Sequence, residues 1–352
     1  MELKRGISVI IPAYNVEKYV KNCIDSIINQ GFSDLEVIVI NDGSSDGTLE
    51  ILEKYNSNDN VMVIDQANQG VSHSRNVGIE LATKEYILFV DSDDWIEPEL
   101  CEIYNFASSN DLDFLICAHR TISTIKIDNR YIFGDKNVVF DSFTDIEEKI
   151  KLPTLGRYDG NFKPQQLDRL TPVWARLYKT SIIKKNKIKF IDMKLIPSEC
   201  LQFNFDFCQF INKAGYIPVV LYNYRRNVEI SITKKYRADL LRKWIWWEGY
   251  FKKKYTHLLQ NEKYYHAYIY RICSSLIPLG GNAIKAKGIK NQIKEIKVIL
   301  HEERINTAIK SERFNSSNVI WKSFFAFARY KKVSLFMIST IAMRTFLNLR
   351  KK

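Results

Sequence analysis

The chain has 352 residues, of which 46% are hydrophobic and 26% charged, and its formal net charge is +12. This composition is typical of a globular protein and is too apolar for an intrinsically disordered one. The 6 cysteines lack the paired spacing of a zinc site, and no separate apolar segment typical of a cleavable signal peptide stands at the start, so we expect a reduced, cytoplasmic protein.

Strands and helices are predicted to alternate in the first part of the chain. Continuous apolar runs predict strands at 7–12, 35–40, 61–64 and 86–90, and apolar residues at helical spacing predict helices at 16–28, 49–55 and 71–82. Such alternation predicts an α/β fold whose central sheet is mostly parallel and carries helices on both faces.

Three polar stretches, at 12–15, 41–44 and 91–94, directly follow predicted strands. In a parallel sheet these stretches meet at one edge, which is where ligands bind. Asp91 and Asp93 flank a single residue, and their hard oxygens suit Mg²⁺ or Mn²⁺. A cation held by two carboxylates usually completes its coordination with substrate phosphates, so we expect a phosphate-bearing ligand.

The sequences ISVIIPAYNVEKYV, VIVINDGSSDGT, QGVSHSRNVGI and YILFVDSDDW resemble, in this order, the motifs of family 2 glycosyltransferases of the GT-A fold. The resemblance covers residues 6–118 and continues more faintly to residue 233. It implies a Rossmann-like GT-A fold, a nucleotide-sugar donor that is commonly UDP-linked, Mn²⁺ or Mg²⁺ as cofactor, and transfer with inversion at the anomeric carbon.

The resemblance also implies a donor site made of Pro12, Tyr14, Asp42, Arg75, Asp91, Ser92, Asp93, Arg225 and Ser231. Tyr14 would pack on the base, Asp42 would accept a hydrogen bond from the uracil ring, and Arg75 would help to position the nucleotide. Asp91 would touch the ribose or donor sugar, and Asp93, with Asp91, would bind the metal. For Arg75 a structural ion pair with a nearby acid is an equal alternative.

Residues 173–190 resemble the family segment near the acceptor, with Trp174 and Tyr178 as candidate sugar-facing aromatics; core packing is the rival interpretation of both. Residues 222–233 resemble the end of the family's catalytic core. There Arg225 or Arg226 would neutralise diphosphate and Ser231 would touch it. A solvated arginine pair is the alternative.

The family usually places a Glu-Asp pair where the base takes the proton of the acceptor hydroxyl. This chain has Glu199 followed by Cys200, and a thiol is mostly protonated at neutral pH. This leaves three alternatives. Glu199 could act as the base, or Asp206 could do so, because seven residues of helix would return it to the face of Glu199. In the third alternative the chain transfers sugar slowly or not at all. Our hypothesis is Glu199.

The C-terminal part is basic: residues 233–352 hold 26 Lys and Arg against 7 Asp and Glu, of totals of 52 and 40. We therefore predict a catalytic domain at 1–232, with a nucleotide-sugar half at 1–118 and an acceptor half at 119–232, and a helical region at 233–352. The basic, aromatic-rich segment 318–352 suits the headgroup region of an anionic membrane, but its longest uncharged run is shorter than the ~20 residues that span one. A helix packed on the protein is the alternative.

These expectations combine into one function. They predict a metal-dependent hexosyl- or N-acetylhexosaminyl-transferase of surface polysaccharide assembly, peripheral on the inner face of the cytoplasmic membrane. Its expected partners are a nucleotide sugar and a glycan or lipid-linked acceptor, without nucleic acid. The alternative, motivated by Cys200, is a catalytically silent sugar-nucleotide-binding protein.

Overall fold

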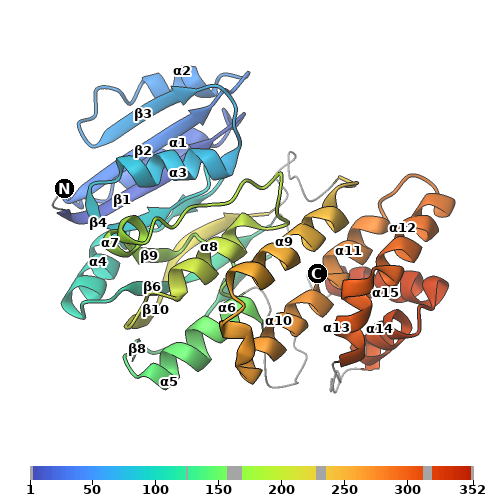
Figure 1. Ribbon diagram of the computed structural model, residues 1–352. Coiled ribbons are helices and arrows are strands. Elements are labelled where there is room, and N and C mark those ends of the chain that lie inside the picture. Colours follow the sequence, from blue (N-terminus) through green and yellow to red (C-terminus); the bar gives the residue numbers. More distant parts are fainter. Residues whose placement is uncertain (1–2, 124–125, 157–168, 227–234, 312–318, 350–352) are drawn as a thin grey trace. The chain divides into compact units, whose positions relative to one another are not determined.

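The computed structural model describes residues 3–123, 126–156, 169–226, 235–311 and 319–349. The chain divides into two compact units. The sheet unit comprises 1–151, 170–193 and 198–228, and the helical unit comprises 152–169, 194–197 and 229–352. Every described strand belongs to the sheet unit (Figure 1). The functional boundaries proposed from the sequence stay a prediction.

The strands of the sheet unit form one sheet in the order β3-β2-β1-β4-β9-β6-β10-β5, with β7 beside β6 and β8 beside β10. Their bounds are β1 (Lys4–Ala13), β2 (Leu35–Asp42), β3 (Val61–Gln66), β4 (Lys84–Phe89), β5 (Trp95–Ile96), β6 (Phe114–Ile122), β7 (Ile127–Arg130), β8 (Val138–Phe140), β9 (Arg176–Lys179) and β10 (Ala214–Arg225). The first four strands are parallel, as predicted. Beyond them the sheet is mixed, because β9 lies antiparallel between β4 and β6.

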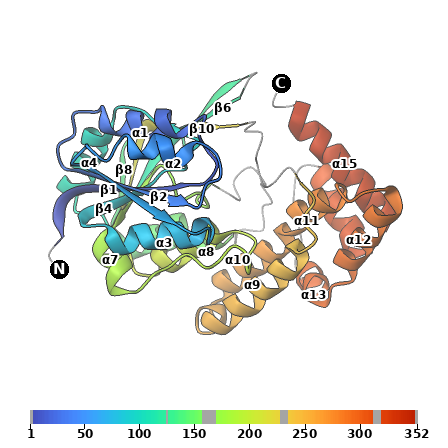
Figure 2. The same cartoon turned by 90° about the horizontal axis from the view of Figure 1, so that it is seen from above.

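Helices cover both faces of this sheet, as Figure 2 shows for α1 and α4 on one face and α3, α7 and α8 on the other. The helices of the unit are α1 (Val20–Ile28), α2 (Thr48–Glu53), α3 (Val71–Leu81), α4 (Leu100–Ser109), α5 (Phe143–Asp145), a π-helix (Ile146–Lys151), α7 (Thr180–Lys185) and α8 (Glu199–Cys208). The β1 strand is buried on both sides, which explains its continuous apolar run.

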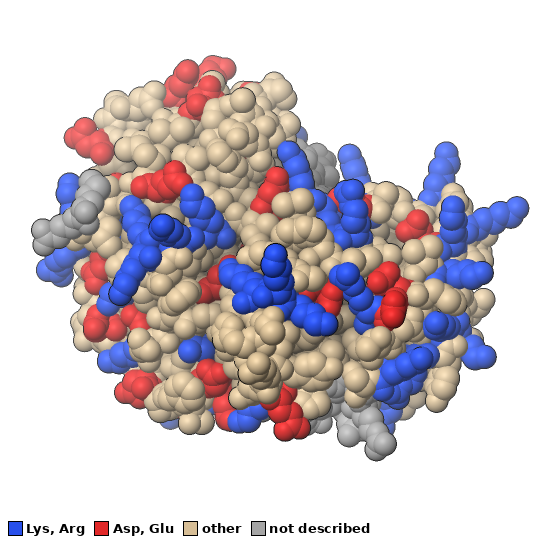
Figure 3. Space-filling view, viewed as in Figure 1, with Lys and Arg blue, Asp and Glu red and all other residues tan. Residues whose placement is uncertain are grey.

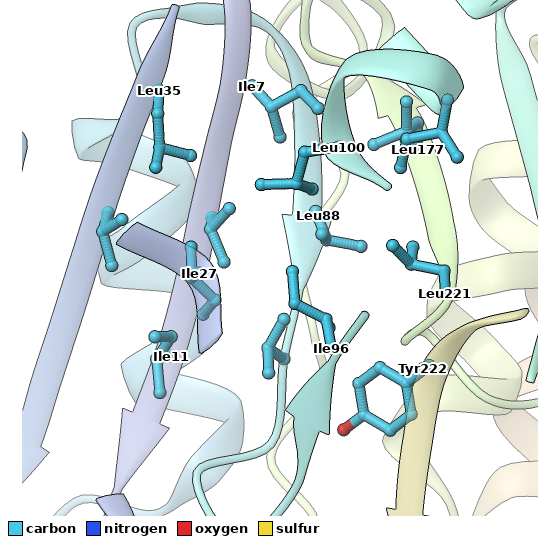
Figure 4. Close-up of a cluster of buried hydrophobic side chains, with 14 of the residues drawn as sticks. Ile7, Ile11, Ile27, Leu35, Leu88, Ile96, Leu100, Leu177, Leu221 and Tyr222 are labelled. Carbon is cyan, nitrogen blue, oxygen red and sulfur yellow. The ribbon is translucent and has the colours of Figure 1, made fainter. Parts of the chain in front are cut away.

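The two hydrophobic cores follow from the alternation of side chains along each strand. Ile7 and Ile11 point into the core beneath α1, which also contains Ile27 and Leu88 (Figure 4). Ile10 points to the opposite core with residues of α3 and α8. A Cβ at Gly78 of α3 would lie 2.4 Å from Ile10 Cγ2, so glycine is what lets this helix approach the sheet closely.

The helical unit contains α6 (Leu152–Leu155), α9 (Leu240–Lys254), a 3₁₀ turn (Leu258–Gln260), α10 (Glu262–Ser274), α11 (Leu276–Ala283), α12 (Ile289–His301), α13 (Glu303–Ser311), α14 (Val319–Arg329) and α15 (Val333–Leu349). Its core is aromatic: Phe324 of α14 packs on Phe336 of α15 at a centroid distance of 4.6 Å, and both are buried. Within the described ranges, none of the helices has the length and apolarity to span a bilayer.

Candidate functional site

The loops that follow β1 and β2 are joined to each other at the carboxyl edge of the sheet. Ala13 is paired with Asn41 in the parallel register, so both strands end together. Asn15 donates its backbone N–H to Ser44 Oγ at 3.0 Å and accepts from the Ser45 N–H at 2.8 Å. The neighbouring Tyr14 is 50% exposed, whereas Pro12 is buried within β1. The ring of Tyr14 is therefore available to a ligand.

Asp42 ends β2 and organises the loop that leads into α3. Its Oδ1 accepts from Gln66 Nε2 at 2.7 Å and from the Gln69 N–H at 2.9 Å, and its Oδ2 accepts from the Gly70 N–H at 2.8 Å. Gly70 has φ 92°, a conformation that favours glycine, and α3 starts at the next residue. A carboxylate accepts about four hydrogen bonds, so the buried Asp42 retains capacity for about one more.

The acidic turn after β4 is held by its last member. Asp94 is 1% exposed; its Oδ1 accepts from the Arg225 N–H at 2.6 Å and its Oδ2 from Tyr222 Oη at 2.7 Å. Burial, and then the charges of Asp93 and Asp91, raise the pKa of Asp94 to about 9. Asp94 is thus neutral at pH 7 and supports the turn.

Asp93 is the carboxylate of this turn that fits a cation. Burial, followed by the charge of Asp91, raises the pKa of Asp93 to about 6. Asp91 forms an ion pair at 2.7 Å, but the described part of the chain gives Asp93 no such partner. No group of three or more His, Cys, Asp or Glu suited to a metal occurs among the described residues, so a cation here needs ligands from its substrate.

Arg225 closes the acidic turn from β10. Its Nε donates to the Asp93 carbonyl at 3.0 Å. Its guanidinium lies between two rings, 4.5 Å from the centroid of Trp95 and 5.1 Å from that of Tyr19. Arg225 therefore ties the loop after β1 to the turn after β4. Ser231 lies outside the described residues.

Arg75 of α3 connects two carboxylates from distant parts of the sequence. It is 4% exposed, its Nη2 donates to Asp91 Oδ1 at 2.7 Å, and its Nη1 donates to Glu199 Oε1 at 2.9 Å. The guanidinium also lies 5.2 Å from the ring centroid of Phe190. The structure thus contains the ion pair considered as an alternative role for Arg75, and it joins the acidic turn after β4 to the start of α8.

Glu199 stands at the first position of α8, where the Ser198 hydroxyl caps the helix and negative charge is favoured. Burial opposes its ionisation, but the charge of Arg75 and hydrogen bonds from its own amide, Arg75 and Cys200 outweigh that effect and lower the pKa of Glu199. Burial, and then the charge of Glu199, raise the pKa of the Cys200 thiol well above its usual value. Cys200 therefore stays protonated at neutral pH, while Glu199 is ionised.

Asp206 lies in the same helix and is 6% exposed. Its Oδ1 accepts from Gln202 Nε2 at 2.7 Å. Its role as the base stays the weaker of our two predictions.

The two acceptor-site aromatics differ in their surroundings. Tyr178 is completely buried, and its Oη donates to Asn204 Oδ1 at 2.7 Å, so the prediction that it faces a sugar is wrong and core packing is its role. Trp174 is half-buried and stacks on Tyr222 at 4.6 Å and Tyr224 at 5.5 Å. Trp174 is the ring shared by these two contacts, and His119 meets it edge-on at 4.8 Å. Its acceptor role stays a prediction.

Tyr222 is a site residue that sequence reasoning missed. Its hydroxyl accepts from the Asp91 N–H at 3.1 Å and donates to Asp94, so one phenol connects the acidic turn to the ring stack of Trp174. The signal was present, because Tyr222 opens the segment that resembles the end of the catalytic core. Tyr222 reaches these acids because β10 pairs with β5, the short strand that directly follows the acidic turn.

Comparison with known proteins identifies the family of the chain. A family model described as "Glycosyl transferase family 2" matches residues 8–184. Among curated proteins, the putative glycosyltransferase EpsH of Bacillus subtilis (strain 168) is 31% identical over 239 residues, which are 67% of this chain and 64% of EpsH. The poly(ribitol-phosphate) beta-glucosyltransferase of Bacillus spizizenii is 36% identical over 190 residues, covering 52% of this chain and 26% of that protein. The chain thus spans less than two thirds of these relatives.

Solved structures show the same fold. Residues 1–349 of S. aureus TarS, crystallised in complex with UDP-GlcNAc, superimpose with a TM-score of 0.66 and 20% identity over 97% of this chain and 92% of that one. This similarity confirms the GT-A fold with a helical C-terminal region. Since the family model also matches half of its length, the chain belongs to glycosyl transferase family 2.

Proposed function

We propose that the chain is an inverting, metal-dependent hexosyl- or N-acetylhexosaminyl-transferase that uses a UDP-sugar. The observation that carries this proposal is the bridge made by Arg75, which binds Asp91 of the acidic turn and Glu199 at the start of α8. One buried cation thereby fixes the distance between the acid expected to face the donor and the acid expected to face the acceptor. That spacing is what a direct transfer between two bound substrates requires.

The donor half follows from the first two loops. A base that stacks on the exposed ring of Tyr14 lies beside Asp42, since the Asn15 and Ser44 bonds hold the two loops together. The remaining acceptor capacity of Asp42 suits the imide N–H of uracil. TarS was crystallised with UDP-GlcNAc, which makes UDP-sugars the first donors to test.

A divalent cation fits the acidic turn. Asp93 supplies a carboxylate without an ion pair among the described residues, and Asp91 keeps its Oδ2 free of the Arg75 bond, so both can offer hard oxygen ligands. When bound, Mn²⁺ or Mg²⁺ would supply charge neutralisation for the departing diphosphate. Arg225, packed against the turn, adds a fixed positive charge at the same edge.

The chemistry expected of the protein is a proton transfer coupled to displacement. The acceptor hydroxyl oxygen forms a bond to the anomeric carbon from the face opposite the leaving group, and the bond from that carbon to the UDP oxygen breaks. Glu199 takes the hydroxyl proton. Arg75 keeps Glu199 ionised, the form that a base needs, although the same charge weakens its basicity.

The acceptor is proposed to be a glycan or a lipid-linked saccharide of surface polysaccharide assembly, reached at the cytoplasmic face of the membrane. This proposal is supported by the name of the relative that glucosylates poly(ribitol phosphate) and by the basic C-terminal region. Half-buried Trp174 is the candidate aromatic for an acceptor sugar.

The second candidate is a silent sugar-nucleotide-binding protein, which the protonated Cys200 at the usual base position favours. The two are separated by purified full-length chain incubated with UDP-sugars and Mn²⁺. UDP release above the rate of a Glu199→Gln variant supports the transferase. Thermal stabilisation by UDP-sugar and Mn²⁺ without any UDP release would instead identify the binder.

A further inference from the structure

On α9 of the helical unit, an exposed aromatic ring lies in a row of four side chains that begins and ends with a cation. Arg242, Trp246, Tyr250 and Lys254 follow one another at intervals of four residues and so lie on one face of the helix. Trp246 is 37% exposed and stacks on Tyr250 with a centroid distance of 5.2 Å and an interplanar angle of 9°. Lys254 Nζ lies 5.5 Å from the ring centroid of Tyr250.

This arrangement leaves Trp246 with a ring face for a ligand. The ring of Tyr250 is stacked on Trp246 and lies 5.5 Å from Lys254 Nζ. Across the residues that the structure describes, Trp246 has only the ring contact with Tyr250, and 37% of its surface is exposed. Arg242, about one helical turn before it, is exposed as well.

The positive charge around Trp246 is not neutralised by the acids of the helix. Glu248 accepts from Tyr268 Oη and pairs with Arg304 at 2.7 Å, and Asp239 pairs with Lys243. None of the ion pairs found in the described ranges involves Arg242, Lys252 or Lys253 of this helix. Figure 3 shows Lys and Arg side chains gathered where Figure 1 places α9.

We propose that this face of α9 binds an anionic saccharide chain that runs along the helix, with a sugar ring on the exposed part of Trp246 and phosphate or carboxylate groups of the chain on Arg242, one turn before it, and Lys253, two turns after it. The C–H face of a pyranose is apolar and suits an indole ring, and a guanidinium pairs with phosphate or carboxylate in a fixed geometry. The inference rests on the proposed function in one respect: the saccharide would be part of the acceptor.

The composition of the face distinguishes a saccharide from other anions. An interfacial membrane helix buries a broad apolar side, but Trp246 is the one exposed large hydrophobic residue that the structure describes on α9. Single-stranded nucleic acid is held by several rings on which successive bases stack, and α9 offers one open ring face. A single platform between cations fits one sugar unit of a charged chain.

The test is native electrophoresis of the full chain in gels that contain hyaluronan, poly(ribitol phosphate) or neutral dextran. Hyaluronan has both charge and sugar rings, whereas poly(ribitol phosphate) has charge without a ring and neutral dextran has rings without charge. Retardation by hyaluronan is expected, and Trp246→Ala should weaken the apparent affinity for it by about 10-fold, in line with one lost stacking contact. Trp246→Phe should recover part of that affinity, and Arg242→Ala and Lys253→Ala should each reduce it in a salt-dependent manner. The proposal is overturned if hyaluronan does not retard the chain, or if Trp246→Ala weakens the binding of poly(ribitol phosphate) as much as that of hyaluronan.

Matched controls come from the same unit. Tyr330→Ala removes a ring that is 70% exposed, and Lys322→Ala removes an exposed charge on α14. Both should behave as the unchanged chain does. Equal losses in Trp246→Ala and Tyr330→Ala would overturn the proposal, as would retardation by a (dT)20 oligonucleotide or by anionic vesicles that also depends on Trp246.

The assay contains no donor, so it reports on α9 whether or not the chain transfers a sugar. UDP-dependent thermal stabilisation of each variant is measured in parallel and should be retained, since it depends on residues of the sheet unit. If UDP does not stabilise the unchanged chain, this result counts against the proposed function. If the stabilisation by UDP is lost in Trp246→Ala alone, that variant has a folding defect and no longer supports the saccharide site.

Discussion

Arg75 donates from Nη1 to Glu199 Oε1 at 2.9 Å, although 124 positions separate the two residues in the sequence. With Nη2 on Asp91, the guanidinium is 4% exposed and neutralises two carboxylates. Removing the cation leaves both carboxylates unpaired, with the Glu199 side chain 14% exposed and that of Asp91 30% exposed. We therefore expect Arg75→Met to lower the free energy of unfolding by about 3–5 kcal/mol, measured by urea denaturation.

The surface pair of Glu80 and Lys189 is the control for this prediction. Its atoms also lie close, at 2.8 Å, but the side chains are 63% and 59% exposed. Lys189→Met should cost less than about 1 kcal/mol, because solvent screens the pair. Similar costs for Arg75→Met and Lys189→Met would show that Arg75 has no special structural role.

The base hypothesis predicts a defect in turnover for Glu199→Gln. The amide can still accept a hydrogen bond from Arg75 but cannot take a proton, so kcat should fall by about 10²–10⁴-fold while UDP still stabilises the variant. Cys200→Ser should change kcat little, since the thiol is already protonated. Unchanged turnover in Glu199→Gln would move the role to another group, with Asp206→Asn the next variant to measure.

Those parts of the candidate site that depend on local residue patterns are predictable from the sequence. The apolar runs of β1, β2 and β4 and the polar residues after them define the edge at which Tyr14, Asp42 and Asp93 lie. The position of Tyr178 was not predictable in this way, because its burial results from β9 entering the sheet between β4 and β6. The same holds for the contact of Tyr222 with Asp94, whose partners are 128 residues apart.

The acidic turn predicts a pH-dependent affinity for cations. The pKa of Asp93 is raised to about 6, so the carboxylate loses its charge as the pH falls below that value. The apparent affinity for Mn²⁺ in the presence of UDP should therefore fall by up to about 10-fold per pH unit below pH 6. This affinity is measured from the Mn²⁺ dependence of the thermal unfolding temperature at pH 5 and pH 7.5. Asp93→Asn should bind Mn²⁺ weakly and show a shallower pH dependence; identical slopes in both proteins would contradict a role for Asp93.

The raised pKa of Asp94 predicts that the folded protein loses stability as the pH rises. The pKa of Asp94 is raised to about 9 in the folded protein, so between pH 4 and 9 the folded state retains a proton that the unfolded state releases. Its contribution to stability is present at low pH and is lost as the pH rises. The side chain of Asp94→Asn is neutral at every pH. As the pH rises, the free energy of unfolding of this variant should therefore increase relative to that of the unchanged chain by up to about 1.4 kcal/mol per pH unit.

This comparison is made by urea denaturation from pH 5 to 9 with EDTA, which removes divalent cations. Asp25 offers a control, since its pKa is lowered although burial opposes ionisation, because hydrogen bonds from Lys21 and Tyr55 favour the charged form. Asp25→Asn should show no growing advantage above pH 5. A constant difference between Asp94→Asn and the unchanged chain at every pH would mean that Asp94 is ionised in the folded protein.

The membrane proposal has to be tested on the surface of α15, because several aromatic residues of the segment 318–352 are buried. Trp321, Phe324 and Phe336 are buried in the helical unit, so a chain ending near residue 317 would lose part of its core. Leu335 and Ile338 are 44% and 59% exposed on α15, which has no acidic residue and follows Lys331 and Lys332. An apolar stripe beside cations suits an anionic leaflet.

Replacement of Leu335 and Ile338 by serine should therefore weaken binding to phosphatidylserine-containing vesicles by about 10-fold, as expected for two exposed side chains that bury part of their surface. Val319→Ser on α14 removes a side chain that is 74% exposed and is the control for general loss of apolar surface. Vesicle cosedimentation at two salt concentrations separates the apolar and electrostatic contributions, since only the latter is screened. Equal binding of all three proteins would show that α15 does not contact the bilayer.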